Sequence, residues 1–267
     1  MNINYSLSHR TEEPEDSVLY VVGTPIGNLN DLSLRAINIL KKVSLIACED
    51  TRQTKKLMNK FQIKNTLISF NKHNSFKKIP STIDTLKGGK SIALVCDAGM
   101  PGICDPGEDL VREVRANKLD VICVPGPCAA LTALLSSELP SSKFIFEGFL
   151  PKKKISRKEI LLEISNNEKS TIIYEAPHRI KKLLNELKEY CGGKRKIHIA
   201  REITKKYEDH ISSDIDSTIK FLENKEVLGE FTIIINGVKK DSKGDIDELS
   251  IKEDLQNLVD AGLSLSS

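Results

Sequence analysis

The sequence has no tryptophan, and aromatic residues make up only 5% of its 267 residues. It contains no apolar run close to the roughly 20 residues that a membrane-spanning helix needs. Its N-terminal segment also lacks the apolar stretch of a secretory signal. We therefore predict a cytoplasmic protein that does not cross a membrane. Because aromatic side chains are few, we do not expect a surface that stacks many single-stranded bases.

The cysteines and histidines follow no metal-binding pattern. None of the six cysteines forms a Cys-x-x-Cys pair, and the five histidines form no cluster with zinc-binding spacing. Several cysteines lie in apolar runs such as IALVCD, where cysteine is usually a small buried side chain. We predict reduced thiols and no bound metal.

The common nucleotide-binding and hydrolase motifs are absent as well. Gly23 and Gly27 do not make the G-x-G-x-x-G pattern of dinucleotide-binding folds. Gly89-Lys90-Ser91 resembles the end of a phosphate-binding loop, but Asp84 stands where the first glycine belongs. A predicted strand also follows Ser91 where a helix should begin. With no G-x-S-x-G motif either, the sequence argues against an ATPase and against a serine hydrolase.

The formal net charge of +3 is the sum of three segments with different net charges. Residues 1–150 carry +2, residues 151–240 carry +6 and residues 241–267 carry −5. An acidic tail therefore cancels most of the charge of a basic second half. Such an asymmetry indicates where a polyanionic partner could bind, but it says nothing about the fold.

Short apolar runs alternate with helical patterns along the first half of the chain. Residues 91–96 (SIALVC) form a continuous apolar run after Ser91, which is typical of a strand covered by helices on both faces. The alternation predicts an α/β fold with a mainly parallel sheet. The expected strands are 18–22, 45–48, 66–70, 91–96 and 121–124, and the expected helices follow Ser33 and cover 51–61, 79–87, 108–117 and 128–137.

A polar stretch broken by Pro140, residues 136–142 (SSELPSS), is the best candidate for a domain boundary. We predict two α/β domains, residues 17–138 and 143–240. The second has expected strands at 144–147, 171–174, 197–201 and 231–236, and expected helices at 156–165, 178–190 and 216–222. Residues 1–16 are expected to be a flexible extension. Residues 241–267 are expected to be an acidic linker with the start of a short or truncated helical segment.

Loops rich in glycine and proline follow several of these strands. They begin at Gly23, Asp97, Pro125 and Tyr174. Ligands of open α/β sheets bind at the carboxyl ends of the strands, and glycine lets a backbone approach a ligand closely. Each loop alone could simply reverse the chain, but three on one sheet edge favour the floor of a cofactor site.

Seven motifs in a fixed order give the chain a family resemblance: VVGTPIGNLNDLSLRA, IACEDTRQTKKL, DAGMPGICDPG, VPGPCAALTAL, FEGFLPKK, YEAPHRI and AREITKKYE. From about Val18 to Val238 the chain closely resembles the ribosomal RNA small subunit methyltransferase I family of the tetrapyrrole methylase superfamily. The resemblance implies two α/β domains with S-adenosylmethionine in the cleft between them, and a homodimer. It also implies methyl transfer to the 2′-hydroxyl of a cytidine, number 1402, in the decoding region of 16S rRNA of the small ribosomal subunit.

The same resemblance assigns residues to the cofactor. Pro25 should face its methionine end, and Tyr174 and Ala200 its adenine. Met100 stands where similar sequences commonly have threonine, so backbone groups are expected to make that contact. The full set implied by the resemblance is Pro25, Asp97, Gly99, Met100, Ile103, Cys128, Ala129, Tyr174 and Ala200.

Polar side chains at the predicted strand ends are the candidates for catalysis, because a ribose hydroxyl is a weak nucleophile that a base or a cation would activate. We expect Asp50 or Glu175 as the base, with Arg52, Arg179 and Arg201 as substrate-orienting cations. Each has a structural alternative: Asp50 could cap the next helix, Glu175 and Arg201 could form a simple ion pair, and residues 178–179 could lie on a helix surface. Glu49, His73, His178 and Glu202 are further candidates.

A basic cluster follows the predicted domain boundary and contains Lys152, Lys153, Lys154, Arg157 and Lys158. Such a run is usually only a solvated surface. Beside the cleft, in the segment that carries +6, it becomes a candidate lip for RNA phosphates, with His178 as a further RNA contact.

Two other functions stay open at this point. The acceptor could be a tetrapyrrole precursor or another small molecule. The protein could instead be a non-catalytic RNA- or ribosome-binding relative that retains the fold without binding the cofactor.

Overall fold

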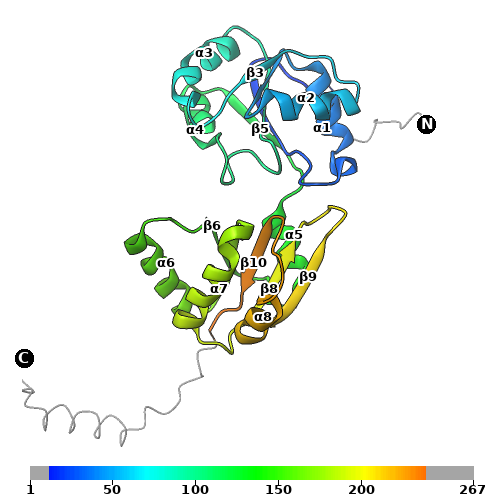
Figure 1. The fold of residues 1–267 in the computed structure, drawn as a ribbon. Coiled ribbons are helices and arrows are strands. Elements are labelled where there is room, and N and C mark those ends of the chain that lie inside the picture. Colours follow the sequence, from blue (N-terminus) through cyan, green and yellow to red (C-terminus); the bar gives the residue numbers. More distant parts are fainter. Residues whose placement is uncertain (1–11, 239–267) are drawn as a thin grey trace, which may run out of the picture.

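The computed structural model describes residues 12–238, which form two lobes, each built around a five-stranded sheet. Figure 1 shows the lobes one above the other, joined where β5 leads into α5. The predicted tail, residues 241–267, and most of the predicted N-terminal extension lie outside the described residues.

The first lobe contains a fully parallel sheet in the order β3-β2-β4-β1-β5. Its strands are β1 (Val18–Val22), β2 (Leu45–Cys48), β3 (Leu67–Ser69), β4 (Ile92–Val95) and β5 (Asp120–Val124). Its helices are η1 (Leu29–Asp31), α1 (Leu34–Lys42), α2 (Thr51–Lys60), α3 (Ser75–Lys87) and α4 (Glu108–Ala116). Apolar side chains of α1 and α2 cover one face and those of α3 and α4 the other. This confirms the predicted α/β architecture.

Local sequence explains where these helices begin. Ser33 caps α1, since its hydroxyl oxygen accepts a hydrogen bond from the backbone N–H of Ala36 at 3.1 Å. Helix α3 begins at Ser75, four residues before the predicted start, and contains Pro80. Proline is most often found in the first turn of a helix, so the sequence predicted a start directly before Pro80, and that start was wrong.

The second lobe contains a mixed sheet in the order β6-β7-β10-β8-β9. Strands β6 and β7 run parallel, and the other neighbours are antiparallel. Its elements are α5 (Ala129–Ser136), β6 (Phe144–Phe149), α6 (Lys154–Asn166), β7 (Ser170–Glu175), α7 (Pro177–Cys191), β8 (Lys196–Arg201), β9 (Asp209–Asp214), α8 (Ile215–Leu222) and β10 (Phe231–Ile235). Edge strand β9 was not predicted because its sequence, DHISSD, is mostly polar.

Helix α5 packs on the second sheet, although it precedes the predicted boundary. Ala130, Ala133 and Leu134 form one apolar cluster with Ile172 and Ile234, whereas α6, α7 and α8 cover the opposite face of that sheet. The chain therefore passes between the lobes before α5, at the VPGP segment, and not at residues 136–142.

The described start of the chain is anchored to the first lobe. Glu13, inside the predicted flexible extension, is 4% exposed and pairs with Arg35 of α1 at 2.6 Å. Among the helices of residues 12–238, none is both long and apolar enough to cross a bilayer.

Candidate active site

A cavity of about 620 Å³ lies between the two lobes. Loops after β1 and β4 line it from the first lobe, and both strands end side by side in the parallel sheet. The carboxyl ends of β6 and β7 and the start of β10 line it from the second lobe, while the start of α5 closes it. The cavity thus occupies the strand-end position at which open α/β sheets bind ligands.

The loops that form the cavity floor are held against one another by backbone contacts. Thr24 and Gly99 exchange two hydrogen bonds of 2.9 and 3.1 Å. Gly23 and Gly126 approach so closely that a Cβ atom on Gly23 would lie 2.7 Å from the Cα of Gly126. The glycines therefore do more than reverse the chain, because they let three loops pack together at one place.

The structure brings together seven of the nine residues assigned to the cofactor. These are Asp97, Gly99, Met100, Ile103, Cys128, Ala129 and Tyr174. Pro25 is buried and does not line the cavity, and Ala200 is fully buried in the apolar cluster beneath α5.

Several residues that line the cavity were not predicted. The apolar ones include Ile26, Phe149, Ile203 and Phe231, and the polar ones include Lys205, Glu230 and Thr232. Strand β10 supplies two of them. Its sequence predicted only a buried strand, because nothing in FTIII reveals that its first residues lie at the junction of the lobes.

Tyr174 joins the cavity wall to α5. Its hydroxyl oxygen accepts a hydrogen bond from the backbone N–H of Ala130 at 3.0 Å. Its ring packs edge to face with Phe146 and Phe149 at centroid distances of 5.1 and 5.7 Å. Burial raises the pKa of the Tyr174 phenol, so the group stays neutral at physiological pH.

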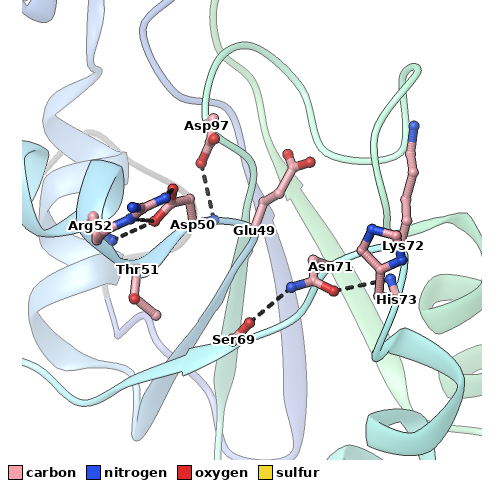
Figure 2. A pocket seen from close by; sticks show the side chains of 9 residues that line it. All are labelled: Glu49, Asp50, Thr51, Arg52, Ser69, Asn71, Lys72, His73 and Asp97. Carbon is pink, nitrogen blue, oxygen red and sulfur yellow. Dashed lines mark hydrogen bonds and ion pairs between the residues drawn. The ribbon is translucent and has the colours of Figure 1, made fainter.

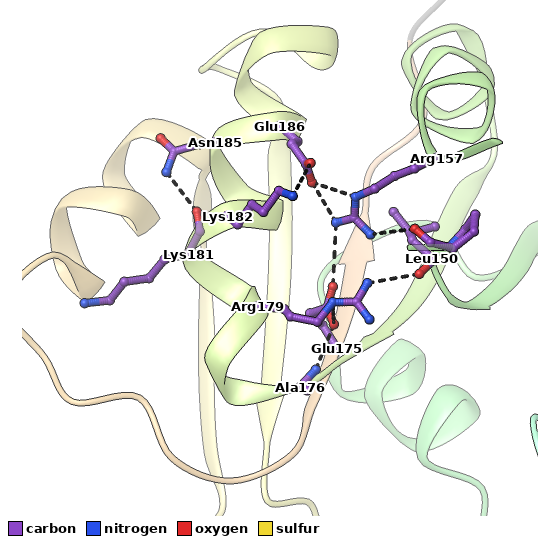
Figure 3. Close-up of polar contacts among 10 residues, drawn as sticks. Leu150, Arg157, Glu175, Ala176, Arg179, Lys181, Lys182, Asn185 and Glu186 are labelled. Carbon is purple, nitrogen blue, oxygen red and sulfur yellow. Dashed lines mark hydrogen bonds and ion pairs between the residues drawn. The ribbon is translucent and has the colours of Figure 1, made fainter. Parts of the chain in front are cut away.

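Glu175 lies in a buried network of charged side chains (Figure 3). Its carboxylate pairs with Arg179 at 3.1 Å and approaches Arg157 at 3.7 Å, and its side chain is fully enclosed. Arg157 also binds Glu186 at 2.6 Å, and Arg179 donates to the backbone oxygen of Leu150 at 3.0 Å. An enclosed, ion-paired carboxylate is a poor general base, and the enclosed guanidinium of Arg157 cannot contact RNA. The burial therefore corrects two predictions, Glu175 as the general base and Arg157 as an RNA contact.

Asp50 has the structural role that was the alternative to catalysis. It caps α2, and its carboxylate binds the Arg52 side chain at 2.7 Å and the Arg52 backbone N–H at 2.8 Å. Hydrogen bonds from the Arg52 side chain lower the pKa of Asp50 to about 2. A carboxylate with so low a pKa accepts a proton poorly at neutral pH, so Asp50 is also a weak candidate for the base.

Three other carboxylates are better proton acceptors. Glu49, Asp97 and Asp105 line the cavity between the lobes. Burial raises the pKa of each of them, and the neighbouring negative charges raise it further. Only Glu49 was among the predicted catalytic candidates, and Asp97 was assigned to the cofactor.

The remaining predicted residues are dispersed. Arg201 donates to the backbone oxygen of Leu228 at 2.5 Å and does not pair with Glu175. His178 is exposed and lines the cavity. His73 lines a second, adjoining cavity. Residues 152–154 are exposed where β6 leads into α6, next to Phe149 of the cavity wall.

Comparisons with known proteins agree with this geometry. A sequence profile of the tetrapyrrole (corrin/porphyrin) methylases matches residues 18–218. A ribosomal RNA small subunit methyltransferase I from Thermotoga maritima is 43% identical over 219 residues, covering 82% of this chain and 98% of its own. Proteins of the same name from Synechocystis and Bacillus subtilis are 39% and 40% identical over 249 residues, covering 93% and 92% of this chain and 89% and 85% of their own.

Solved structures share the fold at much lower identity. A cobalt precorrin-4 methyltransferase superposes with a TM-score of 0.61 at 12% identity, covering 82% of this chain and 95% of its own. A uroporphyrin-III-C-methyltransferase from Thermus thermophilus superposes with a TM-score of 0.58 at 14% identity, covering 82% and 94%. The chain thus belongs to the tetrapyrrole (corrin/porphyrin) methylases and, within them, to the ribosomal RNA small subunit methyltransferase I family.

Proposed function

We propose that this protein uses S-adenosylmethionine to methylate the 2′-hydroxyl of a cytidine ribose in the decoding region of 16S rRNA. The observation that carries the proposal is the cavity between the lobes, flanked by exposed lysines, in a chain about 40% identical to small-subunit rRNA methyltransferases over most of its length.

The residues of the cavity fit the cofactor. S-adenosylmethionine has an apolar purine face, a ribose with two hydroxyls, and a charged amino-acid end. Apolar Ile26, Ile103 and Phe231 offer a surface for the purine, and the Asp97 carboxylate offers an acceptor for hydroxyl or ammonium groups. The glycine-rich loops leave backbone groups accessible at the floor, which suits a ligand recognised by main-chain hydrogen bonds.

Most of the rate enhancement would come from aligning the acceptor oxygen with the methyl group and the sulfur of the cofactor. When bound, the cofactor supplies a sulfonium methyl for an in-line displacement, and the two lobes fix the acceptor oxygen relative to it. Of the carboxylates that line the cavity, Asp97 and Asp105 are the proposed acceptors of the hydroxyl proton, since burial raises the pKa of each above its usual value. The floor loops and the Tyr174 wall would exclude water.

A methylation assay distinguishes this function from methylation of a small molecule and from RNA or ribosome binding without enzymatic activity. Purified protein and labelled S-adenosylmethionine are incubated with 30S subunits or with a tetrapyrrole precursor. We expect label in 16S rRNA alone, as a 2′-O-methylcytidine. Label in the tetrapyrrole would support the alternative acceptor, and no cofactor binding by calorimetry would support the non-catalytic alternative.

The lysine lip, residues 152–154, is proposed to contact RNA phosphates. Changing all three lysines to glutamate should lower rRNA methylation by about tenfold or more, with a weaker dependence on salt, while the Kd for the cofactor stays the same. The control carries the same charge change at Lys41, Lys42 and Lys118, which are exposed near the amino ends of the strands. An equal loss in both variants would show that the lip has no special part in RNA binding.

We also propose a cytoplasmic homodimer. Six free thiols suit a reducing compartment. Leu131 and Leu135 of α5 are 46% and 77% exposed, one helical turn apart, and a second copy could cover them. Light scattering on the purified protein should give twice the mass of the chain, and the mass of a monomer would contradict the proposal.

A further inference from the structure

A second cavity of about 450 Å³ adjoins the cleft between the lobes and shares Glu49 and Asp97 with it. It lies where β2, β3 and β4 end (Figure 2). Segment 69–73 forms one side and segment 50–52 the other. A group bound here would lie directly next to a ligand in the larger cleft.

The lining of this cavity is polar and carries charges of both signs. Three carboxylates, Glu49, Asp50 and Asp97, face two permanent cations, Arg52 and Lys72. A phosphate would be repelled by the carboxylates. A neutral group that both donates and accepts hydrogen bonds fits better, and a nucleobase is such a group.

Most of the polar groups around the cavity are already bonded to protein partners. Arg52 and Asp50 bind each other, and Lys72 donates to the backbone oxygen of Cys104 at 3.0 Å. The Asn71 side chain accepts from the backbone N–H of His73 at 3.0 Å and donates to the Ser69 hydroxyl at 3.2 Å (Figure 2). These bonds fix the walls and leave few groups to recognise a ligand.

Glu49 has fewer protein partners than these groups. Within residues 12–238, its carboxylate makes no ion pair and no hydrogen bond with another side chain, and its protein contact is with the backbone N–H of Asp97. Figure 2 shows the side chain extended into the space between Asp97 and Lys72. Burial and the charges of Asp105 and Asp97 raise the pKa of Glu49. An N–H donor on a bound ligand would relieve the cost of keeping this carboxylate ionised.

We infer that this second cavity binds the base of the acceptor nucleotide and that Glu49 selects cytosine by accepting a hydrogen bond from its exocyclic amino group. The inference rests on the proposed function. Carboxylates accept from this amino group, whereas uracil presents an oxygen at the same position and would be repelled. Proteins that recognise RNA sequence read the edges of unpaired bases in this manner.

The test compares 30S subunits that carry cytidine or uridine at the methylated position. Glu49→Gln should reduce the cytidine-to-uridine ratio of methylation rates by about tenfold, because an amide can donate to the uracil oxygen. Glu49→Asp keeps a carboxylate and should retain the preference at a lower rate. Glu113→Gln, the same chemical change on the exposed face of α4, should leave the ratio and both rates unchanged.

Cofactor binding by calorimetry and a melting curve accompany each variant. If Glu49→Gln lowers both rates equally, Glu49 acts as the proton acceptor or as a structural residue, and the inference is overturned. If the unchanged protein methylates neither RNA although it binds the cofactor, the proposed function fails and the inference fails with it. A loss of preference in Glu49→Gln alone supports the inference.

Discussion

Replacing Arg157 with alanine is expected to lower the free energy of unfolding by about 3 kcal/mol or more. The guanidinium of Arg157 is enclosed between Glu175 and Glu186, and the side chain of Glu175 has no exposure to solvent. Without Arg157, the enclosed carboxylate of Glu175 keeps Arg179 but loses its second cation, and Glu186 loses its 2.6 Å ion pair. Breaking a buried network of this kind costs far more than losing a surface contact, so chemical denaturation should show a clear shift in the midpoint.

Lys158 provides a matched control for this experiment. It is the next residue of α6 and is exposed, so Lys158→Ala should change the free energy of unfolding by less than about 0.5 kcal/mol. If the Arg157→Ala protein were as stable as the unchanged protein and bound RNA more weakly, the arginine would be an RNA contact after all. The structural account would then be wrong.

Replacing Cys128 with tryptophan is expected to weaken S-adenosylmethionine binding by about a hundredfold or more, equivalent to about 2.8 kcal/mol. Cys128 lines the cavity between the lobes, in an extended backbone conformation that any side chain can adopt. The indole would occupy space that the cofactor needs. Isothermal calorimetry measures the effect directly, and a melting curve verifies that the variant is folded.

The control for this variant is Cys123→Trp, the same change on the exposed part of edge strand β5. We expect unchanged cofactor affinity there. Undiminished binding by the Cys128→Trp protein would mean that the cofactor binds elsewhere.

The sequence predicted the first lobe well because its central strands are buried throughout and because α1 and α2 begin at side-chain caps. Such strands are continuous apolar runs, as in β1 and β4, and they alternate with amphipathic helices. Strand β9 has no such pattern, because it lies at an edge with mostly polar side chains. The crossing point between the lobes was misplaced because the VPGP segment was interpreted as a loop of the cofactor floor, which left the polar residues 136–142 as the candidate boundary.

The site was only partly predictable for a different reason. The glycine-rich loops gave the position of the cavity floor, whereas Thr232 and Lys205 reach the cavity only because the second lobe is placed against the first. Arg157 stands in a lysine-rich run, and neither its burial nor its two carboxylate partners can be read from its neighbours in the chain.

The proposed methylation of one ribose of 16S rRNA can be mapped directly in cells. 16S rRNA is isolated from a strain that has the protein and from one that lacks it, and 2′-O-methylation is mapped across the decoding region. We predict that one cytidine loses its 2′-O-methyl group in the strain without the protein and regains it when the chain is supplied again. A 2′-O-methyl group that persists at that cytidine without the protein would show that another enzyme makes the modification.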